Sequence, residues 1–280
     1  MSNAVRVGNV EIVSVLDASM TAPWSALFPN IAQDAMEPYR QHLSADGSQI
    51  TISISSFIVR AGGKTILVDT GLGAKNRPFF SNGRLPEALA ENGIAPADVD
   101  VVLATHIHVD HVGGHTTAKG DGFVPAFPRA KHVFTRAEWD HWTAPAIANA
   151  PGNEYVVDSV LPLQGVADIE LVDDEYQLGD EITLIPTPGH TPAHTSFLIA
   201  SAGESAVILG DVAHTPMQVT ETGWSPVFDF NPVQSAESRE KLMDRLEKEQ
   251  PLLAAGHFPH PGFGRVVRVD GKRYWRGLAS

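Results

Sequence analysis

Near the start of the chain, apolar and polar residues follow the patterns of β-strands. The stretch Val5–Leu16 is rich in branched side chains, and Gly8 and Asn9 inside it fit a hairpin turn. Within Ile50–Ile54, isoleucine alternates with threonine and serine, which is the period of a strand that buries one face. Another strand is expected at Thr65–Asp69, because a glycine turn precedes this apolar run. The chain is therefore expected to open with consecutive strands.

The rest of the chain mixes short apolar runs with helical segments. Three runs have the length of strands: Val101–Ala104, Glu181–Ile185 and Ala206–Leu209. The first is unbroken, which is typical of a strand buried on both faces. Helices are predicted at Pro86–Glu91 and from Asn231 to Glu249, where Asn231 caps the helix and Pro232 takes its first position. This mixture indicates an α/β fold in which two sheets carry helices on the outside. Because no repeat or linker divides residues 1–280, a single domain is expected.

Four apolar runs end at a residue that is able to bind metal or support a site. These residues are Asp69, His106, Asp211 and His257, and a glycine directly precedes the last two. Glycine permits close approach of the backbone where a strand gives way to a loop. An ordinary strand end explains any one of these residues. Four together indicate polar groups gathered at one sheet edge.

The densest group of such residues lies in Thr105–Gly114, which reads THIHVDHVGG. Side chains two positions apart in an extended segment point the same way, so His106 and His108 can bind one ion together. Asp110 and His111 follow where the chain turns, and they can reach a second ion. Imidazole and carboxylate are ligands that zinc uses in proteins. A structural role accounts for a lone histidine, but poorly for four ligand-type residues within six positions.

This motif, followed by His190, Asp211 and His257, resembles the metallo-β-lactamase superfamily. The resemblance extends from the LVDTG segment at Leu67–Gly71 to the Gly-His pair at 256–257. It implies an αββα sandwich of two mixed β-sheets, with the site at one edge of the paired sheets. It also implies two metal ions, the first on His106, His108 and His190 and the second on Asp110, His111 and His257, with Asp211 as the bridge. Zinc is the expected divalent ion, and manganese, iron or cobalt also fit these ligands.

The resemblance gives further residues a role beside the ligands. Asp69 resembles an aspartate that orients a ligand histidine and fixes its tautomer, and a plain turn residue is the alternative. His194 is expected to support the site rather than bind metal, because only a tight turn separates it from His190. His115 is expected to be structural or solvated. Asp110 is a candidate proton carrier as well as a ligand, after attack by a hydroxide that two ions share.

Composition narrows the setting and the class of substrate. The chain has no cysteine, which excludes disulfides and thiolate ligands and favours a cytoplasmic location. Neither a signal-like N-terminus nor an apolar run of membrane-spanning length is found, so no membrane association is expected. A formal net charge of −13 disfavours nucleic-acid partners. The basic residues near the C-terminus are interpreted as a solvated strand face: Arg265, Arg268, Lys272, Arg273 and Arg276.

Because the superfamily covers many reactions, elimination has to narrow the substrate class. One class of β-lactamases with this fold uses a cysteine that the chain lacks, and RNA-processing members need a basic surface. What remains resembles the lactonases and the methyl parathion hydrolase-like esterases. The expected function is a hydrolase that opens lactones or cleaves carboxylic esters of small apolar molecules, as a monomer or homodimer. An organophosphate triester or aryl-ester hydrolase, and a metal-binding scaffold without turnover, remain as alternatives.

His214 and several aromatic segments are candidates for contacts with the substrate. N-acyl homoserine lactonases often carry a tyrosine three residues after the bridging aspartate, where this chain has His214. The imidazole can donate a hydrogen bond to the substrate in its place, and a solvent-facing ring is the alternative. An apolar wall is expected above all from Trp224, Phe228 and Phe230. Other candidates are Met20, Trp24, Leu27 and Phe28 in an early loop-like stretch, Phe79 and Phe80, and Trp139 and Trp142.

Overall fold

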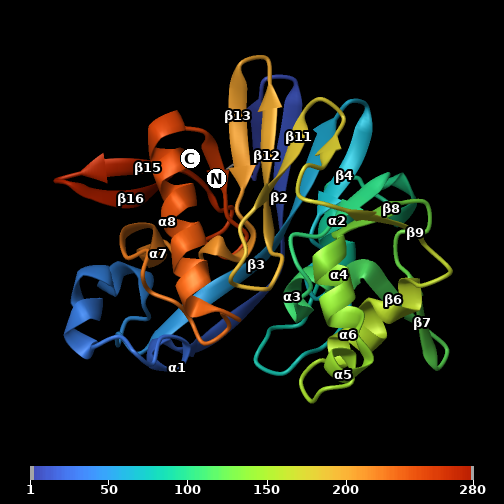
Figure 1. Cartoon of the computed structure of the whole chain (residues 1–280), viewed down its shortest axis with the longest axis horizontal. Coiled ribbons are helices and arrows are strands. Elements are labelled where there is room, and N and C mark those ends of the chain that lie inside the picture. Colours follow the sequence, from blue (N-terminus) through green and yellow to red (C-terminus); the bar gives the residue numbers. More distant parts are fainter. Residues whose placement is uncertain (1–2, 279–280) are drawn as a thin grey trace.

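The computed structural model describes residues 3–278, whose main strands form two seven-stranded sheets (Figure 1). The first sheet has the order β1-β2-β3-β4-β5-β8-β9. Its strands are β1 (Ala4–Val7), β2 (Val10–Pro23), β3 (Gln49–Ala61), β4 (Lys64–Val68), β5 (Val101–Leu103), β8 (Lys131–Thr135) and β9 (Asp168–Val172). The second sheet keeps the order of the sequence. Its strands are β10 (Gln177–Leu178), β11 (Ile182–Pro186), β12 (Thr195–Ser201), β13 (Glu204–Ile208), β14 (Leu252–Ala254), β15 (Phe263–Val269) and β16 (Lys272–Gly277). A separate hairpin consists of β6 (Thr116–Lys119) and β7 (Gly122–Pro125).

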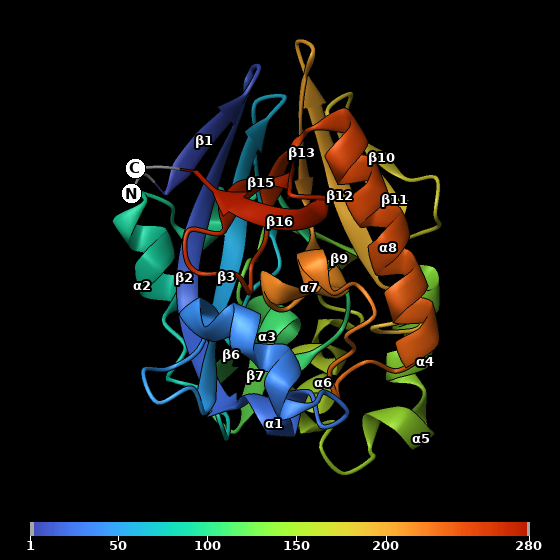
Figure 2. The same cartoon turned by 90° about the vertical axis from the view of Figure 1, so that its left-hand side faces the viewer.

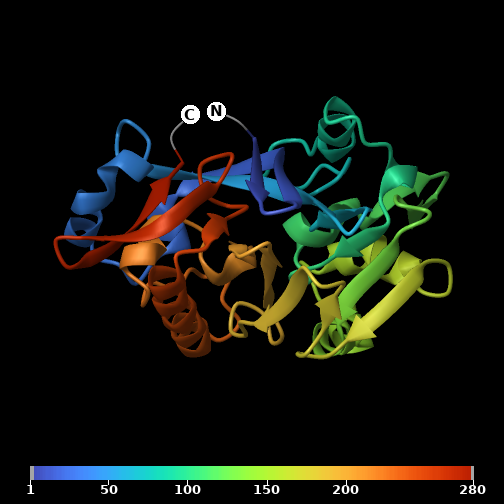
Figure 3. The ribbon, with the colours of Figure 1, turned by 90° about the horizontal axis from the view of Figure 1, so that it is seen from above.

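Helices cover the outer sides of both sheets. From left to right, Figure 2 shows α2, the first sheet, the second sheet and α8, which confirms the predicted αββα sandwich. The view from above also places α2 and α8 on opposite sides of the sheets (Figure 3). The helices are α1 (Trp24–Leu27), α2 (Leu85–Glu91), α3 (Val109–Val112), α4 (Arg136–Thr143), α5 (Pro145–Ala148), α6 (Glu154–Ser159), α7 (Met217–Thr220) and α8 (Pro232–Glu249). Within residues 3–278, no helix combines the length and the hydrophobicity needed to cross a bilayer.

The largest apolar cluster lies between the two sheets. Phe57 and Val59 of β3 belong to one cluster with Ile199 of β12 and Ile208 of β13, and all four side chains are buried. Removal of such apolar surface from water is the dominant favourable term in folding. The predicted alternation is confirmed in β3, where Ile50–Ile54 buries its isoleucines and leaves its polar residues at least partly exposed. Both sheets therefore contribute to one core.

Helix α8 begins as the sequence predicts. Oδ1 of Asn231 accepts a hydrogen bond from the N–H of Gln234 at 3.2 Å, and Pro232 occupies the first turn. Acidic side chains of this helix pair with the β15–β16 hairpin, which carries the basic residues near the C-terminus. Arg273 lies 3.0 Å from Asp244 of α8, and Arg268 also pairs with an acidic residue of this helix. These basic residues therefore lie on a strand hairpin, in part as partners of acidic side chains.

The stretch from Met20 to Phe28 is not a loop, contrary to the sequence-based expectation. Strand β2 continues to Pro23, α1 follows directly, and the side chains of Trp24 and Phe28 are buried. A β-bulge shifts the register of β2 between Leu16 and Ala18. The bulge interrupts the alternation of apolar and polar residues. The second half of the strand therefore cannot be recognised from the sequence pattern.

The bulge places Asp17 where its carboxylate can hold the long loop between β4 and α2. Oδ1 accepts hydrogen bonds from the N–H groups of Arg84 at 2.7 Å and Leu85 at 2.6 Å, and Oδ2 accepts one from Leu72 at 2.6 Å. Burial raises the pKa of Asp17 to about 6, although these backbone donors act in the opposite direction. Gly71 has a φ of 54°, and a Cβ there would lie 2.3 Å from Oδ2 of Asp17. The loop is thus fixed at both of its ends.

Candidate metal centre

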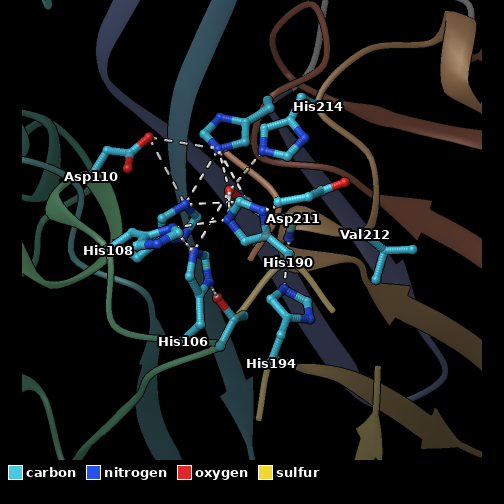
Figure 4. A network of polar contacts seen from close by, with 12 residues as sticks. His106, His108, Asp110, His190, His194, Asp211, Val212 and His214 are labelled. Atoms are coloured by element: carbon cyan, nitrogen blue, oxygen red, sulfur yellow. Dashed lines mark hydrogen bonds and ion pairs between the residues drawn. The ribbon is translucent and has the colours of Figure 1, made fainter. Parts of the chain in front are cut away.

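Two parallel strand pairs, β4–β5 and β13–β14, direct their carboxyl ends to the same edge of the sandwich. His106 and His108 lie in the loop that follows β5, and Asp110 and His111 lie in the short helix α3. The second sheet contributes three more residues from the ends of its strands: His190 after β11, Asp211 after β13 and His257 after β14. Figure 4 shows side chains from both halves of the chain directed toward Asp211.

The glycine before Asp211 allows this close approach. Gly210 has a φ of 58°, and a Cβ at this position would lie 2.5 Å from Nε2 of His194. Nε2 of His194 in turn accepts a hydrogen bond from the backbone N–H of Asp211 at 2.8 Å. His194 therefore fixes the backbone at the Asp residue, in agreement with a supporting role.

One set of donor atoms combines three histidines with Asp211. Nε2 of His106 lies 3.1 Å from Nδ1 of His108, which lies 2.9 Å from Nε2 of His190. Nε2 of His190 lies 3.2 Å from Oδ2 of Asp211. Two donors that each lie about 2.0–2.1 Å from a shared zinc ion are separated by roughly 2.8–3.4 Å, so these distances fit one coordination shell.

A second set lies on the other side of Asp211. Nε2 of His111 and Nε2 of His257 are 3.3 Å apart, and they lie 3.2 and 3.0 Å from Oδ1 of Asp211. Oδ2 of Asp110 is 3.6 Å from Nε2 of His257. Oδ1 of Asp211 therefore faces His111 and His257, whereas Oδ2 lies 3.2 Å from His190 and also 3.2 Å from His257. Oδ1 is buried without a hydrogen-bond donor, an arrangement that a cation would satisfy.

The charges at this edge also favour a cation. Burial lowers the pKa of His106 and of His108 well below the usual value, and neighbouring imidazoles add to the effect. Burial acts the same way on His190, but hydrogen bonds to Asp211 and Asp229 outweigh it and raise its pKa to about 9. The imidazoles around Asp211 hold the pKa of its carboxyl well below the usual value, although burial opposes them. The donor set thus pairs an ionised carboxylate with His106 and His108, which stay neutral, and with His190, whose proton a bound cation would replace.

Hydrogen bonds from outside the donor set orient the histidine rings. Oδ2 of Asp69 lies 2.9 Å from Nδ1 of His111, and Oδ1 accepts a hydrogen bond from the N–H of Thr105 at 2.8 Å. Nδ1 of His257 lies 2.7 Å from the carbonyl oxygen of Ser53. Each contact fixes the tautomer that presents Nε2 to the site. The contact of Asp69 with His111 is the one that the sequence pattern implied.

An apolar cavity of about 440 Å³ opens beside these side chains. Its apolar wall consists of Met20, Ala22, Leu27, Ile52, Phe79, Phe80, Val109 and Phe228, with Tyr155 as a further lining residue. His108, Asp110, His190, Asp211, His214 and His257 form the polar end. No lysine, arginine, serine or asparagine lines this cavity among the described residues. A molecule that fits here is therefore small, largely apolar and without a need for a cationic partner.

Comparison with known proteins agrees with this geometry. The family model of the metallo-beta-lactamase superfamily matches residues 51–257 of this chain. The chain belongs to this superfamily. Its relatives include the N-acyl homoserine lactonase of Bacillus thuringiensis, which is 24% identical over 229 residues that cover 75% of this chain and 83% of that protein. N-acyl homoserine lactonase AttM of Agrobacterium fabrum is 32% identical over 176 residues, or 60% of this chain and 61% of that protein.

Solved structures of the superfamily share the fold along the whole chain. The hydrolase AbOPH is similar with a TM-score of 0.87 and 28% identity, and the match covers 100% of this chain and 99% of that one. AidC, a dizinc quorum-quenching lactonase in complex with a product, has a TM-score of 0.83 at 21% identity and covers 99% and 97%. With its lactonase relatives and the cluster of histidine and aspartate side chains, this superfamily member is a metal-dependent hydrolase.

The structure brings together all seven residues that the superfamily motif singled out, and it sorts the aromatic candidates. Phe79, Phe80 and Phe228 line the cavity, together with Met20 and Leu27. The other aromatic candidates do not line it: Trp24, Phe28, Trp139, Trp142, Trp224 and Phe230. An apolar wall was expected above all from Trp224, Phe228 and Phe230, and of these three only Phe228 lines the cavity. Trp224 is partly buried and packs against Phe28 and Tyr39, and Phe230 is 64% exposed.

His115 and His214 are both buried, which excludes the solvated alternative for each of them. Nδ1 of His115 lies 2.8 Å from Nδ1 of His132, away from the donor set, so His115 is structural. Nε2 of His214 lies 3.2 Å from Oδ2 of Asp211, and its ring stacks on His257 with 5.4 Å between the ring centroids. His214 thus lies at the centre itself.

Sequence reasoning missed three residues that position the centre. Oδ1 of Asp229 lies 3.0 Å from Nδ1 of His190, and Oδ2 lies 3.3 Å from the guanidinium of Arg239. Glu138 accepts hydrogen bonds from the N–H groups of Ile107 at 2.9 Å and Ala193 at 3.1 Å, so it joins two ligand-bearing loops. Arg239 and Glu138 lie in helices whose composition resembles any amphipathic helix. Asp229 lies between two aromatic residues without a motif, so no local signal marks it.

Proposed function

We propose that this chain holds two divalent metal ions, with zinc as the expected metal, and opens lactones or cleaves carboxylic esters of small apolar substrates. The observation that carries the proposal is an apolar cavity without lysine or arginine that ends at two donor sets with Asp211 between them. In this proposal one ion is bound by His106, His108 and His190. The other is bound by Asp110, His111 and His257, and Asp211 bridges both.

The composition of the donor sets supports zinc. Neutral imidazole and carboxylate are its common ligands when no thiolate is present, and the chain has no cysteine. Ions bound there would supply a nucleophilic hydroxide at neutral pH and offset the negative charge that develops on the carbonyl oxygen. Among the described residues, no serine lines the cavity. The proposed hydroxide makes a nucleophilic side chain unnecessary.

Residues of the chain bind the substrate and transfer the proton that the attack releases. Phe79, Phe80 and Phe228 exclude water from the apolar part of the substrate, which places the carbonyl group at the polar end of the cavity. The carboxylate of Asp110 lines the same end, and its side chain is only 14% exposed. We infer that Asp110 receives the proton that the attack releases and delivers it to the departing alkoxide.

The cavity also limits the choice of substrate. A β-lactam carries an anionic group remote from its scissile bond, and the cavity offers that group no lysine or arginine to replace the water around it. A lactone or an alkyl ester is neutral, and the relatives named as N-acyl homoserine lactonases point to the same class. A phosphotriester or aryl ester is neutral as well. This neutrality makes triester hydrolysis the second candidate.

A substrate screen with metal analysis tests the proposal. The purified protein is loaded with zinc, its metal content is measured, and lactones, alkyl esters, aryl esters, phosphotriesters and β-lactams are compared by kcat/KM. We expect about two ions per chain and the highest kcat/KM for lactones or esters. One ion per chain at full activity would disprove the dinuclear centre. Faster turnover of triesters would select the second candidate, and turnover of β-lactams alone would reject both.

A further inference from the structure

His214 lies among the donor atoms of the proposed centre, although the superfamily motif gives it no place there. Its Nε2 lies 3.2 Å from Oδ2 of Asp211, which is the distance that His190 and His257 also keep from this oxygen. Asp211, His214 and His257 each offer a donor atom within 4.8 Å of the other two. The position of Nε2 is thus that of a ligand atom.

The surroundings of the ring argue against a hydrogen bond from His214 to the substrate. His214 lines the apolar cavity, but both of its ring nitrogens are buried and neither has a partner with the angles of a hydrogen bond, although Nε2 lies 3.2 Å from Oδ2 of Asp211. A molecule in the cavity therefore meets carbon atoms of the ring. Buried polar atoms without a partner are rare in proteins, because their desolvation is not compensated. A metal ion beside Asp211 would give Nε2 the missing partner.

The ring is also held in place before any ion binds. It stacks on His257 with an angle of 9° between the two ring planes, and its centroid lies 5.7 Å from that of Phe228. The backbone N–H of His214 donates a hydrogen bond to Oε1 of Gln218 at 2.7 Å. Ligands that the protein holds in position in this way bind a metal at a smaller entropic cost.

We propose that His214 is an additional metal ligand, which binds through Nε2 the ion that Asp211 and His257 hold. This inference rests on the proposed metal centre and replaces the substrate contact that the sequence suggested for His214. The centre then has six histidines and two aspartates. The substrate-binding cavity keeps only carbon atoms of His214 in its wall, in accord with an apolar substrate.

Nuclear magnetic resonance can count the bound histidines directly. The whole chain, labelled with ¹⁵N in its histidine rings, is loaded with ¹¹³Cd²⁺, and scalar coupling between cadmium and each ring nitrogen is recorded. We expect coupling at His214 in addition to the five histidines of the motif. Coupling at those five without His214 would overturn the inference and leave the proposed centre intact. No coupling at any histidine would overturn the centre itself, so the two failures are distinguishable.

A pair of variants gives a second measurement in the zinc-loaded protein. His214→Phe keeps a ring for stacking but cannot bind metal, so we expect the Kd of the more weakly bound ion to rise at least about tenfold. His42→Phe is the matched control, because His42 lines a separate cavity of about 210 Å³ on which His214 also borders. Its Kd for zinc should equal that of the wild type. An unchanged Kd in folded His214→Phe would overturn the inference.

Discussion

Oδ1 of Asp229 lies 3.0 Å from Nδ1 of His190, which leaves Nε2 of the same ring directed at Asp211. A hydrogen bond of this kind fixes the tautomer of a ligand histidine and strengthens it as a donor. Asp229→Ala should therefore weaken zinc binding by about 10–100-fold, as measured by competition with a chelator. Asp244→Ala, an exposed position on α8, serves as the control and should bind zinc like the wild type. Equal affinities for all three proteins would contradict this role.

Arg239 should be far more important for stability than Arg245, the other arginine of the same helix. Its side chain is fully buried and donates hydrogen bonds to the carbonyl oxygens of Val212, Thr222 and Trp224. Arg239→Met leaves the carboxylate of Asp229 buried without its cation, so the free energy of unfolding should fall by about 3–5 kcal/mol. Arg245→Met removes only an exposed pair and should cost less than about 1 kcal/mol. Urea unfolding of both variants measures the difference, and similar losses would refute the argument.

The proposed proton transfer by Asp110 predicts a dependence on the leaving group. Asp110→Asn keeps the shape of the side chain but cannot carry a proton. The loss in kcat should be about 10²–10⁴-fold for alkyl lactones, whose alkoxide needs a proton as it leaves. It should be much smaller for nitrophenyl esters, whose leaving group is already stable. Metal content is measured on the same samples, and equal losses at unchanged content would mean that Asp110 acts only as a ligand.

The apolar cavity predicts a preference for longer acyl chains. Each buried methylene contributes about 0.8 kcal/mol, so kcat/KM should rise about fourfold per carbon until the cavity is full. Phe79 is 87% exposed although it lines the cavity, so an acyl chain can cover its ring. Phe79→Ala should flatten the dependence on chain length, whereas Phe230→Ala, outside the cavity, should leave it unchanged. The same slope in Phe79→Ala and wild type would exclude this contact.

Metal removal should reverse the effect of pH on stability. In the metal-free chain the pKa of His190 is raised from 6.5 to about 9, so the folded state favours its protonated form. The resulting stabilisation, about 3 kcal/mol, is fully present below pH 6.5 and is lost as the pH rises through 9. Bound metal requires deprotonated ligands, so the loaded protein should instead gain stability as the pH rises through 6.5, where the unfolded histidines lose their protons, and stay level toward pH 9. Urea unfolding with and without a chelator checks both signs, and parallel curves would contradict the prediction.

Local patterns predicted strands, the long helix and the ligand-type residues between His106 and His111, because each pattern has its cause in a few neighbouring positions, whereas the resemblance to the superfamily implied the roles of His190, Asp211 and His257. The alternation at Ile50–Ile54 and the cap at Asn231 depend only on adjacent residues. The bulge at Asp17 could not be predicted, because its role depends on hydrogen bonds to residues 72–85. The contact between Asp229 and His190 joins residues that are 39 positions apart. A single aspartate without a surrounding motif gives no indication of this contact in the sequence.

The spacing of the donor residues has a consequence for the order of assembly during synthesis. The segment from His106 to His111 leaves the ribosome first, whereas His190 follows His108 by 82 positions and His257 follows His111 by 146. Neither donor set is complete until the second sheet has docked on the first. Closing loops of this length carries an entropic cost that the folded sheets must offset before an ion finds all its ligands. The ion content of a preparation should therefore measure the fraction of chains in which the two halves have joined.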